Sequence, residues 1–121
     1  MEVTNLIQDT KSLIEGSQQI RLQIHEKQKR LISLGKIEAT VVARFNSVIS
    51  ADKALSNADK RKAALAELKA KDEEYIAVQA ETEVIQDEVE LLKIQLQFNI
   101  DMTKLNLVLL SPSSVPVTLD Q

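Results

Sequence analysis

Apolar residues recur every seven positions along the first fifty residues. One series starts at Leu6 and a companion series at Val3, and together they mark the face that a coiled-coil helix turns toward a neighbour. Each series has seven positions within residues 3–48, and ten of the fourteen positions are apolar. These are Leu6, Leu13, Ile20, Leu34, Val41 and Val48 in the first series and Val3, Ile24, Leu31 and Phe45 in the second. We therefore predict a long amphipathic helix over residues 4–50.

Two glycines are the weak points of this predicted helix. Gly16 and Gly35 each cost roughly 1 kcal/mol relative to alanine in a helix interior. A break near Gly35 would divide the segment and turn a two-helix hairpin into a three-helix unit. The sequence leaves both arrangements open.

A second heptad pattern follows a short interruption. Ser56-Asn57-Ala58-Asp59 carries the signals of a helix start, an N-cap residue and then an acidic side chain. Positions spaced by seven then form two series, Leu68, Tyr75, Thr82, Val89 and Leu96 with Ala64, Lys71, Val78, Ile85 and Leu92. We predict a second helix over residues 58–110, antiparallel to the first, with the turn centred near residue 53.

The C-terminal part of this second helix carries apolar residues on two sides. One stripe runs through Leu96, Ile100 and Leu107, and an additional one through Ile94, Phe98, Met102, Leu105 and Leu109. Two apolar faces require two neighbours, and a lone hairpin would leave much apolar surface in water. We therefore predict a homo-oligomer whose self-association residues are Ile85, Val89, Leu92, Leu96, Phe98, Met102, Leu105 and Leu109.

Residues 94–102 also fit a strand, because apolar and polar residues alternate there. We favour helix, since no Gly or Pro bounds the segment and no other segment offers a partner strand. Pro112 and Pro116 cannot continue a helix, so residues 111–121 are expected to form an extended or disordered tail that is available to a partner.

Composition agrees with an all-α chain. Gly and Pro number two each and aromatic residues make up only 2%, which disfavours strand-rich folds with many turns. We predict a coiled-coil-like antiparallel helical hairpin forming one domain over residues 1–110. The absence of cysteine excludes disulfides and thiolate metal sites. No signal peptide or membrane span is evident, so we expect a cytoplasmic protein.

Charge is segregated along the chain. Residues 21–71 hold twelve Lys or Arg and five Asp or Glu, whereas residues 72–101 hold one and nine. In an antiparallel hairpin the two segments face each other, so Lys27, Lys29 and Arg30 are expected to pair with Glu81, Glu83 and Asp87 and to fix the register. Basic residues with few acidic companions remain near the hairpin tip: Arg44, Lys53, Lys60, Arg61, Lys62, Lys69 and Lys71.

This basic tip is the candidate surface for nucleic-acid phosphates or for an acidic protein partner. Phosphate binding would weaken steeply with salt. No aromatic side chain is interleaved with these residues for base stacking, and the pI of about 5.2 does not favour a nucleic-acid coat.

Catalytic and metal-binding motifs are missing from the chain. His25 is the only histidine, and there is no Gly-rich phosphate loop, nucleophile elbow or zinc spacing. Glu83, Asp87 and Glu90 share a helical face that suits a hard cation, although a solvated acidic face is the commoner use of such residues. We expect no enzyme activity, no catalytic residues, no metal, no cofactor and no small-molecule substrate.

Polar residues also occupy the predicted seams. Lys27, Glu38, Lys71, Thr82 and Asn99 stand at heptad positions, where polar groups lower stability but specify register or oligomer state. Tyr75 lies on the same seam and is expected to pack in the core with its hydroxyl at the edge.

One stretch of the chain resembles a known class of proteins. Ser50-Ala51-Asp52-Lys53, then Asn57 to Leu65, then Tyr75 and a Leu-rich helix are similar to small helical accessory proteins of phages and prophages, among them recombination mediators. The resemblance covers about residues 50–110. It implies a short helical oligomer that binds single-stranded DNA and loads a recombinase.

Three functions are therefore open. The first is an assembly or adaptor module that self-associates and binds a protein partner. The second is a phage-type accessory protein that binds single-stranded nucleic acid through the basic tip. The third is a small inhibitor with an acidic face, suggested by the acidic run from Asp72 to Glu90.

Overall fold

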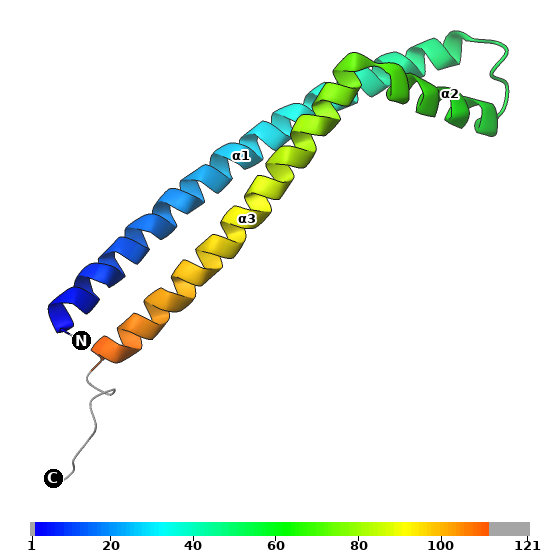
Figure 1. The fold of residues 1–121 in the computed structure, drawn as a ribbon. Coiled ribbons are helices and arrows are strands. Elements are labelled where there is room, and N and C mark those ends of the chain that lie inside the picture. Colours follow the sequence, from blue (N-terminus) through cyan, green and yellow to red (C-terminus); the bar gives the residue numbers. More distant parts are fainter. Residues whose placement is uncertain (1, 112–121) are drawn as a thin grey trace. The chain divides into compact units, whose positions relative to one another are not determined.

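The computed structural model describes residues 2–111 of the chain, which form three α-helices (Figure 1). Helix α1 spans Val3–Ala51, α2 spans Ala58–Lys71 and α3 spans Glu73–Leu110. Helix α1 packs against α3 in a hairpin-like arrangement, and residues 2–111 contain no strand. The predicted all-α helical hairpin is therefore confirmed. Most of the predicted extended tail, from residue 112 onward, lies outside the described residues.

The alternating segment 94–102 is helical throughout and belongs to α3. The helical interpretation of this segment is therefore confirmed. The alternation of apolar and polar residues has another origin, since α3 carries apolar side chains on more than one face.

Helix α1 runs unbroken through both glycines, so no break occurs near Gly35. Both glycines have negative φ angles. A Cβ atom added at Gly35 would meet nothing within 4 Å, whereas one added at Gly16 would lie 3.4 Å from the Nδ2 atom of Asn99. Since the packing of an amphipathic face contributes more to a long helix than propensity does, two glycines are not enough to interrupt this one.

The break lies instead in the second predicted helix, at Asp72. This residue has extended backbone angles (φ −79°, ψ 119°), and its N–H still donates to the Leu68 carbonyl that closes α2. Its Oδ1 atom accepts a hydrogen bond of 2.7 Å from the backbone N–H of Tyr75, so Asp72 is also the N-cap of α3. Glu73 and Glu74 follow in the first turn, where the helix dipole favours acidic side chains.

The predicted start of α2 is confirmed. Asn57 has extended backbone angles, and its Oδ1 atom accepts a hydrogen bond of 2.8 Å from the backbone N–H of Lys60. The connection from α1 is short, and Asp52 shapes it by accepting a hydrogen bond from the backbone N–H of Ala54.

The chain divides into two compact units. The first joins α1 up to Glu26 with α3 from Val89 onward, and the second comprises Lys27–Glu88. The buried residues of the second unit are all apolar: Leu34, Val41, Phe45, Ile49, Val78 and Ile85. The buried residues of the first unit are mixed, comprising Leu6, Ile20, Ile24 and Val89 with Thr10, Ser17 and Asn106.

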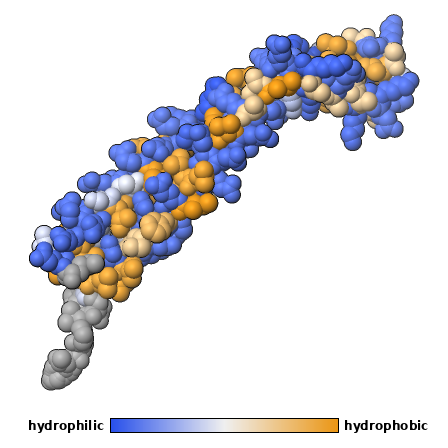
Figure 2. Space-filling model, in the orientation of Figure 1, coloured by the Kyte–Doolittle hydropathy of each residue, from blue (hydrophilic) through white to orange (hydrophobic). Residues whose placement is uncertain are grey.

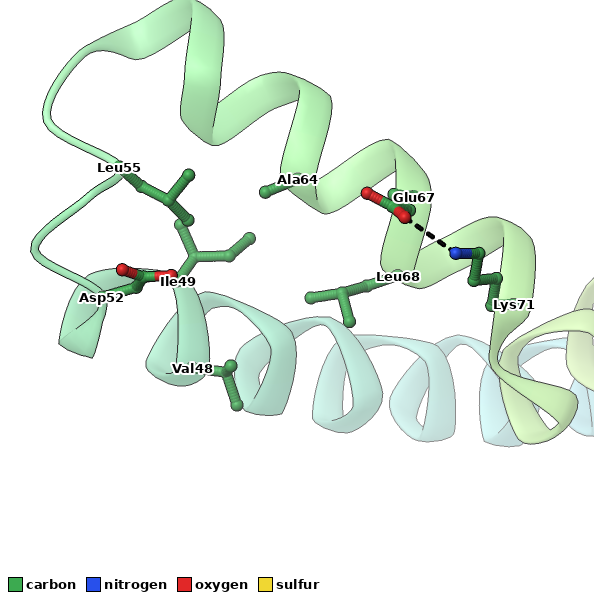
Figure 3. A pocket seen from close by; sticks show the side chains of 8 residues that line it. All are labelled: Val48, Ile49, Asp52, Leu55, Ala64, Glu67, Leu68 and Lys71. Carbon is green, nitrogen blue, oxygen red and sulfur yellow. Dashed lines mark hydrogen bonds and ion pairs between the residues drawn. The ribbon is translucent and has the colours of Figure 1, made fainter.

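The heptad pattern of α1 holds from Leu6 to Phe45 and then shifts by one residue, whereas Val3 at the start of the helix is exposed. Ile49 is buried, whereas Val48, the position that the heptad count predicts, is 59% exposed. Figure 3 shows Ile49 pointing toward α2 and Val48 pointing away from it. The C-terminal end of α1 is therefore covered by α2, and this different neighbour sets a different buried face.

Candidate self-association surface

The seam between α1 and α3 in the first unit is polar for much of its length. Thr10, Ser17 and Thr103 each donate a hydroxyl hydrogen bond to the carbonyl four residues earlier in their own helix, at 2.7, 2.8 and 2.7 Å. These bonds satisfy the hydroxyl groups locally and do not join the two helices. Small polar side chains therefore take up positions at which leucines would bury far more apolar surface.

Asn106 is a buried amide in this seam. Its side chain is only 6% exposed, and it makes no hydrogen bond with any residue in the described part of the chain. It lines a hollow of about 430 Å³ together with Asp9 of α1 and Met102 of α3. A buried amide without a protein partner lowers the stability of this unit.

Apolar side chains of α3 that do not face α1 are left in contact with water. Leu91, Ile94, Phe98 and Leu105 are 67%, 62%, 60% and 51% exposed. Their spacing of three, four and seven residues places them on one side of the helix, and half-buried Met102 completes the series. Figure 2 shows hydrophobic surface along this part of α3. We call these five residues the outer stripe.

The structure divides the predicted self-association set. Ile85 and Val89 are buried within the chain, and Leu92 and Leu96 are half-buried on the same side of α3, so these four pack within the hairpin. Phe98, Leu105 and Leu109 are each more than half exposed, and Met102 is half-buried. Two members of the outer stripe were absent from the predicted self-association set. Ile94 was placed on the additional apolar stripe only, and Leu91 was missed because heptad counting followed its neighbour Leu92.

Ion pairs join α1 and α3 in the second unit, as the charge segregation predicts. The Arg30 guanidinium makes two hydrogen bonds with the Glu81 carboxylate, of 2.7 and 2.8 Å. The Lys27 ammonium lies 3.0 Å from a carboxylate oxygen of Glu88. Of the predicted pairings, that of Arg30 with Glu81 is present. Lys29, Glu83 and Asp87 form no ion pair within residues 2–111.

Hydrogen bonding within these pairs shifts the pKa values of their members. The hydrogen bond and the charge of Glu81 raise the pKa of Arg30, and the hydrogen bond from Arg30 lowers the pKa of Glu81. The same effect operates within α2, where the hydrogen bond between Lys71 and Glu67 raises the pKa of Lys71 and lowers that of Glu67. Each shift favours the charged form and therefore the ion pair.

The predicted basic tip is less uniform than the sequence suggests. Arg44 forms ion pairs with Glu74 and Asp72, at 3.2 and 3.7 Å, and Lys71 pairs with Glu67. Two more of the seven residues have other contacts. Arg61 donates to the carbonyl of Leu55, and the Lys69 ammonium lies 5.6 Å from the centroid of the Tyr75 ring. Lys53, Lys60 and Lys62 have no ion pair, side-chain hydrogen bond or cation–π contact with the described residues.

Two aromatic rings anchor the second unit. Phe45 is buried and lies 6.2 Å from the half-buried ring of Tyr75, with the ring planes tilted by 50°. The predicted seam position of Tyr75 therefore matches its packing. The Arg44 guanidinium lies 6.0 Å from the centroid of the Phe45 ring, which places a cation beside this cluster.

A hollow of about 330 Å³ lies at the tip of the second unit, between the end of α1 and α2 (Figure 3). Ile49, Leu55 and Leu68 supply apolar walls, and the Glu67–Lys71 ion pair lies at its edge. Helix α2 has no fully buried residue. It therefore packs less completely than α1 and α3.

The acidic face and the single histidine do not form a metal site. No group of three or more His, Cys, Asp and Glu side chains in residues 2–111 is arranged to hold a metal ion. His25, Glu83, Asp87 and Glu90 are all exposed.

Two further findings bear on the class of protein. Within the described residues, no helix is both long enough and apolar enough to cross a bilayer. No protein-family model, curated protein or solved structure gives a significant match to the chain.

Proposed function

We propose that this chain is a non-enzymatic assembly module, which self-associates through the outer stripe of α3 and presents the rest of its surface to a protein partner. One observation carries the proposal: Leu91, Ile94, Phe98 and Leu105 are exposed on one side of α3. Burying a side chain of this size releases about 1.5–3 kcal/mol, and a large exposed apolar patch is typical of an interaction site.

The polar seam of the first unit supports the same proposal. Thr10, Ser17 and Asn106 are buried inside the unit, whereas larger apolar residues of α3 stay outside. A hairpin that worked as a monomer would gain from the opposite arrangement. A second neighbour on the outer side of α3 offsets the free-energy cost of exposing these apolar residues, because it covers the outer stripe.

A double substitution tests the proposal. Leu91→Glu with Phe98→Glu places two charges in the outer stripe. We expect the natural chain to be an oligomer and the double variant to be a monomer, with the mass of each measured by light scattering. Leu22→Glu with Ile32→Glu is the matched control, since both are similarly exposed apolar residues of α1 and the pair adds the same two charges. Helicity by circular dichroism should be unchanged in both. If the double variant keeps the mass of the natural oligomer, the outer stripe is not the interface.

A second candidate function is nucleic-acid binding of the recombination-mediator type. It is favoured by Lys53, Lys60 and Lys62, which are exposed and have no ion pair within residues 2–111. Replacing these three lysines with Gln should abolish salt-sensitive binding of a short single-stranded DNA. Replacing Lys11, Lys29 and Lys93 with Gln removes the same charge elsewhere on the chain and should leave that binding intact. Equal losses in both variants would argue against a site at the tip.

A further inference from the structure

The charges beside the outer stripe indicate how two copies meet. We infer that α3 of one copy packs antiparallel on α3 of a second copy, with the two-fold axis close to Gln97. This inference rests on the proposed function, since it specifies the partner and the orientation of that self-association.

The area of the stripe fits a second copy of the chain. Leu91, Ile94, Phe98 and Leu105 are each more than half exposed. At roughly 100 Å² of apolar surface for each side chain, they present about 400 Å² per copy, which half-buried Met102 extends. A standard interface buries about 800 Å² per partner, of which about 60% is apolar. The outer stripe therefore offers nearly the apolar area that a stable interface of this size contains.

The spacing of the stripe suits an antiparallel partner. Consider two copies of α3 that run antiparallel and cross their two-fold axis at residue 97. A residue of one copy then lies level with the residue of the second copy whose number is 194 minus its own. Phe98 of the second copy then lies level with Leu96, between Ile94 and Phe98 of the first. The other stripe residues interleave in the same way, because Leu91, Ile94, Met102 and Leu105 of the second copy lie level with residues 103, 100, 92 and 89 of the first. This interleaving is the condition for knobs-into-holes packing.

Charge selects the antiparallel orientation over the parallel one. Glu90 and Lys104 lie fourteen residues apart, close to four helical turns, so they flank the same side of the stripe. Neither forms an ion pair within the described residues. The antiparallel pair places Glu90 level with Lys104 of the second copy, and symmetry repeats this contact. A parallel, in-register pair instead places Glu90 beside Gln95 and gives no opposite charges. Surface ion pairs of this kind contribute little to stability but set orientation and register.

Distances between spin labels test the orientation directly, since the chain has no cysteine of its own. One sample carries the label at Glu83→Cys and a second sample carries it at Gln97→Cys. The molar mass of both samples is measured by light scattering. The antiparallel pair separates two labels at position 83 by about 28 helical residues, or roughly 40 Å, and brings labels at position 97 within about 20 Å. A parallel pair brings both sets of labels close together.

Charge exchange provides a second test that leaves the stripe intact. Glu90→Lys alone and Lys104→Glu alone should each raise the dissociation constant of the dimer several-fold, because like charges then face each other. The double variant should restore it to within about twofold of the natural value. Two results would overturn the antiparallel arrangement and leave self-association intact. One is a dimer with short distances between the labels at both positions, and the other is a double variant whose dimer dissociates more readily than that of either single variant. Monomers in every sample would overturn self-association itself.

Discussion

Arg30 and Glu81 are fifty-one residues apart in the sequence, yet the guanidinium of Arg30 makes two hydrogen bonds with the Glu81 carboxylate, at 2.7 and 2.8 Å. This fork-shaped contact joins α1 to α3 in the second unit. Two parallel bonds define orientation better than a single ammonium contact does. The pair therefore fixes the register of the two helices more than it adds to their stability, since both side chains are exposed to solvent.

The pair predicts a pH dependence of stability. The hydrogen bond from Arg30 lowers the pKa of Glu81 in the folded state, so the pair contributes fully above the ordinary glutamate pKa and is lost as pH falls through the lower folded value. The difference in melting temperature between the natural chain and Glu81→Gln should therefore shrink between pH 7 and pH 3. Glu83→Gln is the control, because Glu83 forms no ion pair within residues 2–111. A constant difference for Glu81→Gln would contradict the assignment.

Gly35→Ala should stabilise the chain by about 0.5–1 kcal/mol. The glycine lies in the middle of α1, and the added methyl group would meet nothing within 4 Å. Gly16→Ala is the informative comparison. Its methyl group would lie 3.4 Å from Asn99, so a smaller gain is expected there. Urea unfolding at one protein concentration measures both changes, and a loss of stability in Gly35→Ala would show that α1 is bent or open at that position.

Leu34→Ala should destabilise the second unit by about 2–5 kcal/mol, because Leu34 is only 1% exposed and its removal leaves a cavity. Leu22→Ala makes the same chemical change at a position that is 59% exposed, so it should alter stability by no more than about 0.5 kcal/mol. Thermal unfolding followed by circular dichroism compares the two. Equal effects would mean that α1 and α3 do not pack through the described seam.

Asn106→Leu should raise the stability of the first unit by about 1–2 kcal/mol. The amide is buried and has no hydrogen-bond partner in the described chain, whereas leucine fills a similar volume without a polar group. Asn46→Leu is the control, since Asn46 is exposed on α1 and the substitution brings the same change in helix propensity. A loss of stability in Asn106→Leu, measured by urea unfolding, would mean that the amide has a partner in solution.

The sequence predicted the helices and most of their facing residues, because heptad spacing depends only on the geometry of the helix. The pattern failed where a third element intervened. Ile49 replaced Val48 in the core because α2 covers the end of α1 there. The break at Asp72 was missed because the heptad pattern continues across it without Gly or Pro, although an aspartate followed by two glutamates is a helix-start signal.

The candidate surface was predicted only in part. Phe98 and Leu105 belonged to the predicted set and are exposed, whereas Ile85 and Val89 face inward. Periodicity alone does not say which of two apolar stripes faces the partner helix of the same chain. That choice depends on α1, whose buried residues set the side of α3 that turns inward.

The mass of the natural chain in solution, measured by light scattering across a wide range of protein concentration, tests the central claim most directly. An interface of the predicted size should give a dimer or a multiple of it at micromolar concentration, with dissociation on dilution. A mass that stays at 13.5 kDa up to the highest concentrations would contradict self-association through the outer stripe.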